Sequence, residues 1–356
     1  MKVCIIGDGL ASLTLASVLI QKDLNVDIFT KRKSNLYDRS RTLGISSSNI
    51  DYFNNEITNI KKILWKINSI KIYTEKNTKK ELLKFHNEKK EIFSILKNYQ
   101  LQKLLLRKLQ NSKLIKFKKN LNFDKNKYKL IINSDPNHPY IKKFFSNKIE
   151  KNYNSYAYTT TIIHKKIKNN TAFQNFTKNG PLAFLPISDS ETSIVYSLRS
   201  SKKKSILEMN DLVKKYNPIY SIKSFNDWNN FSLRSSSLRN YYKDNILAFG
   251  DLLHKLHPLA GQGFNMSLRD IKLLSDLIDE KINLGLDLDT SICEEFQKKS
   301  QSKNFIFLSG IDWIYELFNL ESKINFNILN NSINFIGNNK IVNKFLKSFA
   351  DSGIRY

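Results

Sequence analysis

The stretch that most constrains the fold is residues 245–270, which read NILAFGDLLHKLHPLAGQGFNMSLRD. An apolar run at 246–249 ends at Gly250-Asp251, as a buried strand ends in a polar turn. The loop Gly261-Gln262-Gly263 follows, and apolar residues then recur every three or four positions, as in an amphipathic helix. Glycines let a backbone approach a ligand, and a helix N-terminus offers free N–H groups to negative charge. The stretch therefore predicts a site for a flat, anionic ligand.

A second glycine loop lies near the start of the chain, inside a β-α-β pattern. An apolar strand at 3–6 leads into Gly7-Asp8-Gly9-Leu10-Ala11-Ser12, and a helical pattern and a strand at 24–29 follow. This is the context that a dinucleotide-binding fingerprint requires. Gly7 permits the tight turn, and Gly9 lets the backbone reach a pyrophosphate at the helix N-terminus. The candidate cofactor contacts in this loop are Gly7, Gly9, Leu10, Ala11 and Ser12.

The longer motif resembles a known family. The order Gly250-Asp251, His254, Pro258, Gly261-Gln262-Gly263, Asn265 and Arg269-Asp270 is similar to the second flavin motif of the FAD-dependent aromatic-ring monooxygenases, which have the p-hydroxybenzoate hydroxylase fold. The segment Leu-His-Pro-Leu-Ala-Gly-Gln-Gly-Phe-Asn most resembles the same segment in the ubiquinone-biosynthesis branch of this family. The alternative is a phosphate-binding turn in another α/β enzyme. The resemblance implies that FAD is bound by Gly250, Asp251, Pro258, Gly261, Gln262, Gly263, Phe264 and Asn265.

Two positions depart from the dinucleotide fingerprint. Ser12 stands where the third glycine is expected, and it is small enough to keep helix and strand close. The acidic residue that normally ends the second strand and binds the ribose falls at Thr30, whereas Asp27 lies inside the strand. A threonine hydroxyl makes one hydrogen bond but not a bidentate, charge-assisted contact. We expect Thr30 to be a weaker cofactor contact than is usual.

Three further positions are expected to reach the cofactor by resemblance. Arg41 matches the arginine of the family's Arg-Thr-x-Ala-Leu-Ser segment, and a guanidinium fork suits a pyrophosphate; a surface arginine is the alternative. Gln102 lies in a helical pattern at 94–109 that returns to the nucleotide domain. Asp135 matches the aspartate of an Ala-Asp-Gly-x-x-Ser motif, but Pro136 replaces its glycine. Because proline lacks an N–H and fixes φ, a turn-forming aspartate is the alternative there.

A second, mostly antiparallel sheet is expected to form the substrate domain. Residues 173–187 resemble the family's Phe-Thr-x-x-Gly-Pro-Leu-Ala-x-Leu-Pro segment, which lies over the flavin. Leu182, Phe184 and Tyr196 are candidates to line an aromatic substrate pocket, with ordinary sheet core as the alternative. Candidate catalytic residues are His254, His257 and Pro258, the two histidines to pass protons or only to orient their loop.

Composition limits the remaining function classes. The net charge is +26, but the lysines are spread along the chain and no nucleic-acid-binding motif accompanies them, so we expect no nucleic-acid partner. The 2 cysteines predict a reducing compartment, and no metal-ligand spacing occurs. No signal peptide or membrane span is expected, which predicts a cytoplasmic protein. Amphipathic helices within 307–318 and 341–349 pack on the core or, as an alternative, contact the inner face of the cell membrane.

The expected architecture is α/β: a Rossmann-like FAD-binding domain (1–60, 95–152, 238–300), an inserted sheet domain (61–94, 153–237) and C-terminal helices (301–356). The resemblance implies that NAD(P)H reduces FAD, that O2 forms a C4a-hydroperoxide, and that an aromatic ring is hydroxylated. The first hypothesis is a hydroxylase of a polyprenylated phenol in ubiquinone biosynthesis. The alternatives are a degenerate subunit that scaffolds a quinone-biosynthesis complex and another FAD oxidoreductase of this fold.

Overall fold

A six-stranded sheet carries Gly7 and Gly250 at the carboxyl ends of two of its parallel strands. The computed structural model describes residues 1–30, 40–75, 81–86, 91–119, 124–200, 203–256 and 262–323. The strand order is β16-β17-β9-β1-β2-β8, in which only β16 is antiparallel to its neighbour. The strands are β1 (Lys2–Ile6), β2 (Asn25–Phe29), β8 (Ile115–Lys118), β9 (Leu130–Asn133), β16 (Tyr242–Lys243) and β17 (Ile246–Ala248).

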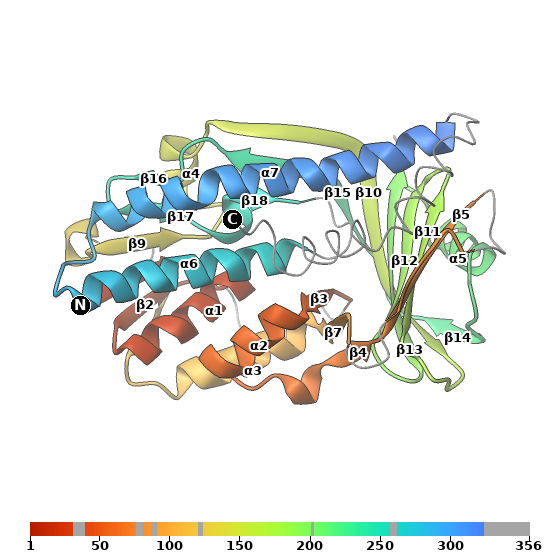
Figure 1. Ribbon diagram of the computed structural model, residues 1–356, viewed down its shortest axis with the longest axis horizontal. Coiled ribbons are helices and arrows are strands. Elements are labelled where there is room, and N and C mark those ends of the chain that lie inside the picture. Colours follow the sequence, from red (N-terminus) through yellow and green to blue (C-terminus); the bar gives the residue numbers. More distant parts are fainter. Residues whose placement is uncertain are drawn as a thin grey trace.

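Helices cover this sheet and form the larger core with it. Buried apolar residues of β1, β2, β9 and β17 pack against α1, α3, α6 and the first turns of α7. Figure 1 shows α6 and α7 running side by side along the nucleotide half. Among the described helices, none has the length and apolar character needed to cross a bilayer. The helices are α1 (Leu10–Leu19), α2 (Ser47–Glu56), α3 (Asn98–Gln110), α4 (Pro139–Phe144), α5 (Ile206–Lys215), α6 (Gly263–Asn283) and α7 (Thr290–Lys323).

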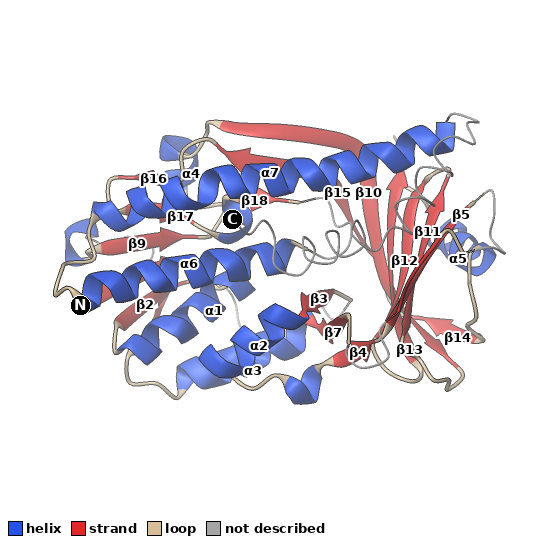
Figure 2. Ribbon diagram, in the orientation of Figure 1, coloured by secondary structure: helices blue, strands red, loops and turns tan. Residues whose placement is uncertain are grey.

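A nine-stranded, mostly antiparallel sheet forms the other half of the molecule (Figure 2). Its only parallel pairing among the described strands joins β5 and β11. A three-stranded sheet of β3 (Thr42–Ser46), β4 (Trp65–Ile67) and β7 (Phe93–Lys97) lies between the halves. The nine strands are β5 (Ser69–Thr74), β6 (Leu83–His86), β10 (Lys148–His164), β11 (Thr171–Thr177), β12 (Gly180–Pro186), β13 (Glu191–Arg199), β14 (Ile222–Phe225), β15 (Asn229–Leu238) and β18 (His254–Lys255).

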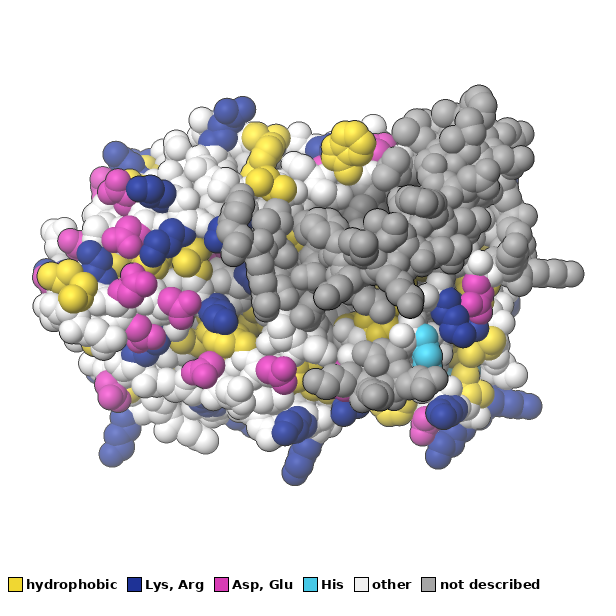
Figure 3. All heavy atoms as spheres, viewed as in Figure 1, with side chains coloured by type: hydrophobic (Ala, Val, Ile, Leu, Met, Phe, Trp, Pro, Cys, Tyr) yellow, Lys and Arg dark blue, Asp and Glu magenta, His cyan; other side chains and the backbone are white. Residues whose placement is uncertain are grey.

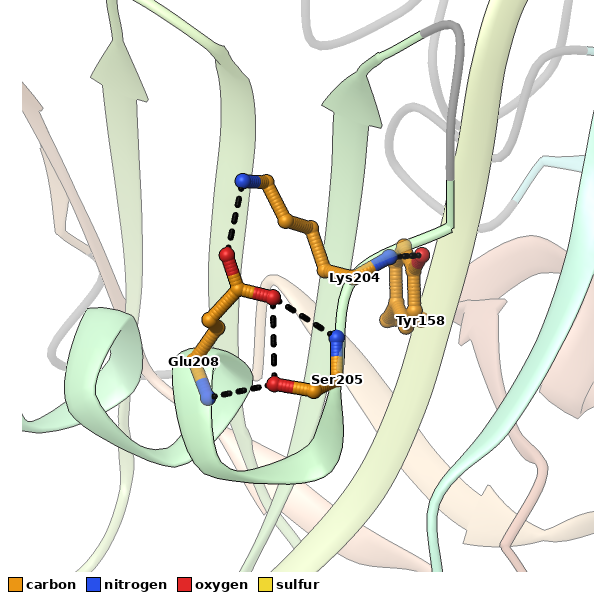
Figure 4. A network of polar contacts seen from close by, with 4 residues as sticks. All are labelled: Tyr158, Lys204, Ser205 and Glu208. Atoms are coloured by element: carbon orange, nitrogen blue, oxygen red, sulfur yellow. Dashed lines mark hydrogen bonds and ion pairs between the residues drawn. The ribbon is translucent and has the colours of Figure 1, made fainter.

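Helix α5 covers the outer face of the large sheet. It begins with a capping box, in which the Ser205 hydroxyl accepts from Glu208 N and the Glu208 carboxylate accepts from Ser205 N at 2.8 Å (Figure 4). Lys204 N donates to the Tyr158 hydroxyl at 2.7 Å, which ties the start of the helix to β10. The helix then buries Met209 and Val213 against the sheet.

Most expected elements are present, with one boundary corrected. The helix expected at 94–109 begins only at Asn98, because Ile95 pairs with Gly44 and Trp65 in the three-stranded sheet. The helix expected around 307–318 lies inside α7, and the one at 341–349 lies outside the described residues. The domain boundaries stay a prediction.

Candidate functional site

The turn after β1 is shaped by the absence of a side chain at Gly7. Gly7 has φ +106°, and a Cβ there would lie 2.6 Å from Ser134 Oγ and 3.1 Å from Asp135 N. The Gly7 N–H donates to the carbonyl of Phe29 at 2.8 Å, which holds the turn across β1 and β2. The chain therefore turns sharply at the carboxyl end of the sheet, as the sequence predicts.

The N-terminus of α1 is left without a cap. Gly9 is its N-cap residue, has no side chain to accept from the helix, and is exposed. A Cβ at Gly9 would meet no atom within 4 Å, so the space beside the first turn is open. Leu10 and Ala11 are half-buried, while Ser12 is buried. Uncapped N–H groups and the helix dipole favour an anion, so this turn fits a pyrophosphate.

The second glycine motif meets the first at this turn. Gly250 has φ +64°, and a Cβ there would lie 3.0 Å from the Cβ of Ala11. Asp251, the next residue, is exposed at the end of β17. Gln102, 6% exposed, donates from Nε2 to the carbonyl of Asp8 at 3.4 Å. Segments far apart in sequence thus gather at the carboxyl ends of β1 and β17.

The start of α6 offers a second uncapped helix N-terminus. Its N-cap residue, Gln262, makes no side-chain capping bond, and Gly263 has open space where a side chain would be. Phe264 packs against Phe53 with ring centroids 6.4 Å apart. Three expected residues of this loop, His257, Pro258 and Gly261, lie outside the described residues.

The side chain of Asn265 ties α6 to the elements beside it. Its Oδ1 accepts from Ser46 N at 3.1 Å and from Asn49 Nδ2 at 2.9 Å, and its Nδ2 donates to the carbonyl of Gly44 at 2.8 Å. Asn265 is 2% exposed. The amide is therefore occupied by protein contacts, and it positions the helix N-terminus.

His254 lies in a buried polar cluster. Its Nε2 is 2.5 Å from Asp270 Oδ2, and Asn304 Nδ2 donates to Asp270 Oδ1 at 3.0 Å. His254 and Asp270 are each 2% exposed. The cluster joins β18, α6 and α7. The imidazole is closed off from solvent, and both roles expected for His254 stay predictions.

Asp27 is held inside the sheet, away from the ribose position. Its carboxylate lies 2.6 Å from Lys118 Nζ and 2.9 Å from Lys2 Nζ, and it accepts from the Tyr128 hydroxyl at 2.6 Å. Burial raises the pKa of Asp27, but the hydrogen bonds from Lys118, Tyr128 and Lys2 outweigh burial and leave the pKa below its usual value. Thr30 directly follows β2, and its N–H donates to the carbonyl of Lys118 at 3.0 Å.

Asp135 and Arg41 each contact other residues of the protein, and their roles toward a cofactor stay predictions. Asp135 Oδ1 accepts from Asn137 N at 2.9 Å and so forms a turn before α4. Arg41 is exposed, and its guanidinium lies 5.7 Å from the centroid of the Phe231 ring. Arg41 therefore lies between β3 and the large sheet.

The three residues expected to line a substrate pocket lie in the protein core. Leu182, Phe184 and Tyr196 are each 0% exposed and pack beneath α5 with Met209 and Val213. Figure 1 shows α5 on the opposite side of the large sheet from the nucleotide half. The pocket expectation is thus corrected, and the sheet-core alternative describes them. Both faces of these strands carry apolar residues, so sequence alternation does not tell which face is inward.

The opposite face of the same strands looks toward the nucleotide half. On this face Thr42 and Ser193 hydroxyls lie 2.9 Å apart, so β13 residues of the same parity as Ser193 point the same way. Val195 on β13 and Ala183 on β12 are cross-strand neighbours on this face, and both are half-buried. The sequence pattern did not single out either residue as one that faces the nucleotide half.

Comparison with known proteins identifies the sequence relatives. No family model matches the chain. It is 28% identical over 186 residues to the mitochondrial ubiquinone biosynthesis monooxygenase COQ6 of Dictyostelium discoideum, covering 42% of this chain and 38% of that protein. It is 27% identical over 173 residues to the 3-demethoxyubiquinol 3-hydroxylase of Escherichia coli, covering 46% of this chain and 44% of the relative. The chain resembles the ubiquinone-biosynthesis monooxygenases.

Solved structures establish the fold. The p-nitrophenol 4-monooxygenase PnpA of Pseudomonas putida superposes with a TM-score of 0.79 at 12% identity, covering 99% of this chain and 98% of PnpA. HpxO of Klebsiella pneumoniae, complexed with FAD and uric acid, superposes with a TM-score of 0.75 at 10% identity, covering 99% and 97%. The expected α/β fold of the FAD-dependent monooxygenases is therefore confirmed. By sequence, the chain spans about half the length of the curated relatives it matches.

Proposed function

We propose that this protein is an FAD-dependent monooxygenase that hydroxylates the aromatic ring of a polyprenylated phenol in ubiquinone biosynthesis. One observation carries the proposal: Gly250 of the second glycine motif packs against Ala11 in the uncapped first turn of α1. This contact brings together the two segments that we propose to bind FAD, and the names of the sequence relatives support the pathway.

The residues present fit FAD. The open first turn of α1, behind Gly7 and Gly9, would hold the pyrophosphate, and the exposed Asp251 and the start of α6 at Gly263 would hold the ribityl chain and ring. Bound flavin would supply the oxygen-transfer chemistry, with NAD(P)H as reductant and O2 as co-substrate. The protein's own part is to bind, to orient the ring, and to keep water away from it.

The inner face of the large sheet suits an apolar aromatic substrate. Val195, Ala183 and Phe231 are half-buried, and none of them carries a charge. Burying an apolar ring and prenyl chain there is favoured at about 25 cal/mol per Å² of apolar surface removed from water. The exposed Arg41, stacked near Phe231, offers a cation at the rim of this face.

Helix α7 supports the further proposal of a peripheral membrane contact. It exposes Phe305 (47%), Ile306 (45%) and Trp313 (71%), and these three positions lie on one face of a helix. A polyprenylated phenol partitions into a bilayer, so a surface that lies on lipid would shorten its path to the site.

The decisive experiment measures cofactor and product together. Purified protein is incubated with FAD, freed of excess flavin, and supplied with NAD(P)H, O2 and a short-chain prenylphenol. We expect retained flavin absorbance and a product that carries one added oxygen atom. Cells that lack the gene should accumulate an under-hydroxylated quinone precursor. Normal quinone in such cells would remove the pathway assignment.

A second candidate is a catalytically weak subunit that organises a quinone-biosynthesis complex. It is favoured by one feature, the engagement of Asp27 by two lysines, which leaves only Thr30 at the ribose position. Protein that stays colourless with FAD, yet restores quinone synthesis in deletion cells, would establish this candidate over the enzyme.

A further inference from the structure

Two serines connect the first turn of α1 to the end of β9. Ser12 Oγ and Ser134 Oγ are hydrogen-bonded, and Ser12 is 1% exposed. The Ser134 hydroxyl also donates to the carbonyl of Ile6 at 3.2 Å. A hydroxyl has one proton, so Ser134 uses its proton on Ile6 and accepts the proton of Ser12. The result is a directed chain from α1 through Ser134 to the end of β1.

The same hydroxyl lies directly behind the tight turn. The Cβ position missing at Gly7 lies 2.6 Å from Ser134 Oγ, so Ser134 occupies the space that the glycine leaves. One side-chain oxygen therefore touches the last residue of β1, the turn itself and the helix that follows. These are the three parts of a pyrophosphate-binding loop.

We propose that Ser12 and Ser134 act as a coupled pair that positions the nucleotide loop for its cofactor. Each departs from the expected motif: Ser12 stands at the third glycine, and Ser134 stands at the alanine of Ala-Asp-Gly. A glycine at the third position keeps helix and strand close by omitting a side chain. In this protein, the hydrogen bond between the Ser12 and Ser134 hydroxyls holds the helix close to the strand instead. The cofactor part of this inference rests on the proposed FAD function.

The pair has a physical signature that independent residues lack. S134A leaves the buried Ser12 hydroxyl without its acceptor, and S12A leaves the half-buried Ser134 hydroxyl without its donor, whereas replacing both serines by alanine removes either mismatch. The two single substitutions should therefore cost more than their combination. Ser17 is the matched control, because it lies on the same helix, is buried, and donates only to the carbonyl of Leu13 at 2.8 Å.

The test is a double-mutant cycle of S12A, S134A and S12A/S134A, with S17A alongside. The FAD Kd is measured from flavin fluorescence, and urea unfolding is measured without FAD. We expect S134A to raise the Kd about 5-fold, as loss of roughly one hydrogen bond implies, and S12A to raise it less, because Ser134 keeps its bond to Ile6. The double variant should stay within about 2-fold of the parent. S17A should leave the Kd unchanged.

Additive changes in Kd would overturn the coupling. Unfolding midpoints that shift while every Kd stays constant would overturn the positioning role, since the pair would then serve stability alone. If the parent binds no FAD, the proposed function fails, and the urea cycle then decides the coupling: non-additive midpoints support the pair, and additive midpoints overturn it.

Discussion

Asp27 is a buried carboxylate with two lysines and a tyrosine around it. It is 1% exposed, and its partners come from β1, β8 and the residues before β9. Because the folded pKa lies below its ordinary value, the carboxylate stabilises the fold above the unfolded pKa of about 3.9, and this stability is lost as pH falls through the folded pKa. At the scale of a single residue, the acidic side chain nearest the expected ribose position is a structural charge.

We therefore expect D27N to lower the free energy of unfolding by about 2 to 3 kcal/mol at neutral pH, because two cations lose their buried partner. The difference from the parent should shrink below about pH 4, where the parent carboxylate also becomes neutral. Urea unfolding across pH measures both effects. D189N removes an exposed carboxylate 3.9 Å from Lys166 and should change little. A pH-independent difference would contradict the assignment.

Thr30 is the position where an acidic residue should improve the site. T30E would place a carboxylate at the end of β2, where a ribose is expected to offer two hydroxyls. We expect FAD to bind about 5-fold or more tightly, since a charge-assisted hydrogen bond is roughly twice as strong as a neutral one. T30Q, of similar length and without charge, is the control. Equal Kd values for T30E and the parent would place the ribose elsewhere.

Elements are held to one another by single polar side chains. Asn265 joins α6 to β3 and α2 through three hydrogen bonds, and His254 and Asn304 join β18 and α7 to α6 through Asp270. These contacts therefore fix α6 at Asn265, in its first turn, and at Asp270, further along the helix. Because these contacts hold the helix, its uncapped N-terminus has a fixed position relative to β3 and α2.

N265A should test this role. The substitution leaves Ser46 N, Asn49 Nδ2 and the Gly44 carbonyl without their partner, so we expect a loss of about 3 kcal/mol in unfolding free energy and weaker FAD binding. S267A is the control, because Ser267 makes only a 3.4 Å bond to the carbonyl of Gly263 within the same helix. Parent-like stability of N265A would show that α6 is held by other contacts.

At the scale of the whole molecule, α7 exposes apolar side chains along an edge of the described structure. In Figure 3, hydrophobic side chains lie exposed along the edge where Figure 1 shows this helix. Exposed Trp, Phe and Ile on one helix face, in a chain of net charge +26, support the proposed contact with anionic lipid.

The variant F305S/I306S/W313S should lose co-sedimentation with phosphatidylglycerol vesicles while keeping the parent's unfolding midpoint. Phosphatidylcholine vesicles should bind the parent less, because they lack the anionic charge. I206S/L207S is the matched control, since it removes two exposed apolar residues from α5 on the far side of the large sheet. Equal loss in both variants would mean that lipid binding is not specific to α7.

The sequence by itself determined the backbone of the nucleotide site. Turn glycines and apolar spacing are local, so they predicted the β1–α1–β2 unit, the strand β17 and the helix α6 close to their observed bounds. The resemblance of residues 245–270 to the flavin motif of the FAD-dependent monooxygenases also predicted the α/β fold.

Only the tertiary structure decided which side chains are available to a ligand. Asp27, Asn265 and His254 are each engaged in the core by partners that lie 16 or more positions away in the chain, and the sequence pattern does not indicate these contacts. Leu182 and Ala183 differ by one position, and only the packing of α5 decided that the first is core and the second faces the site. Local spacing sets the backbone, whereas burial and polar partners depend on contacts between distant segments, which spacing does not encode.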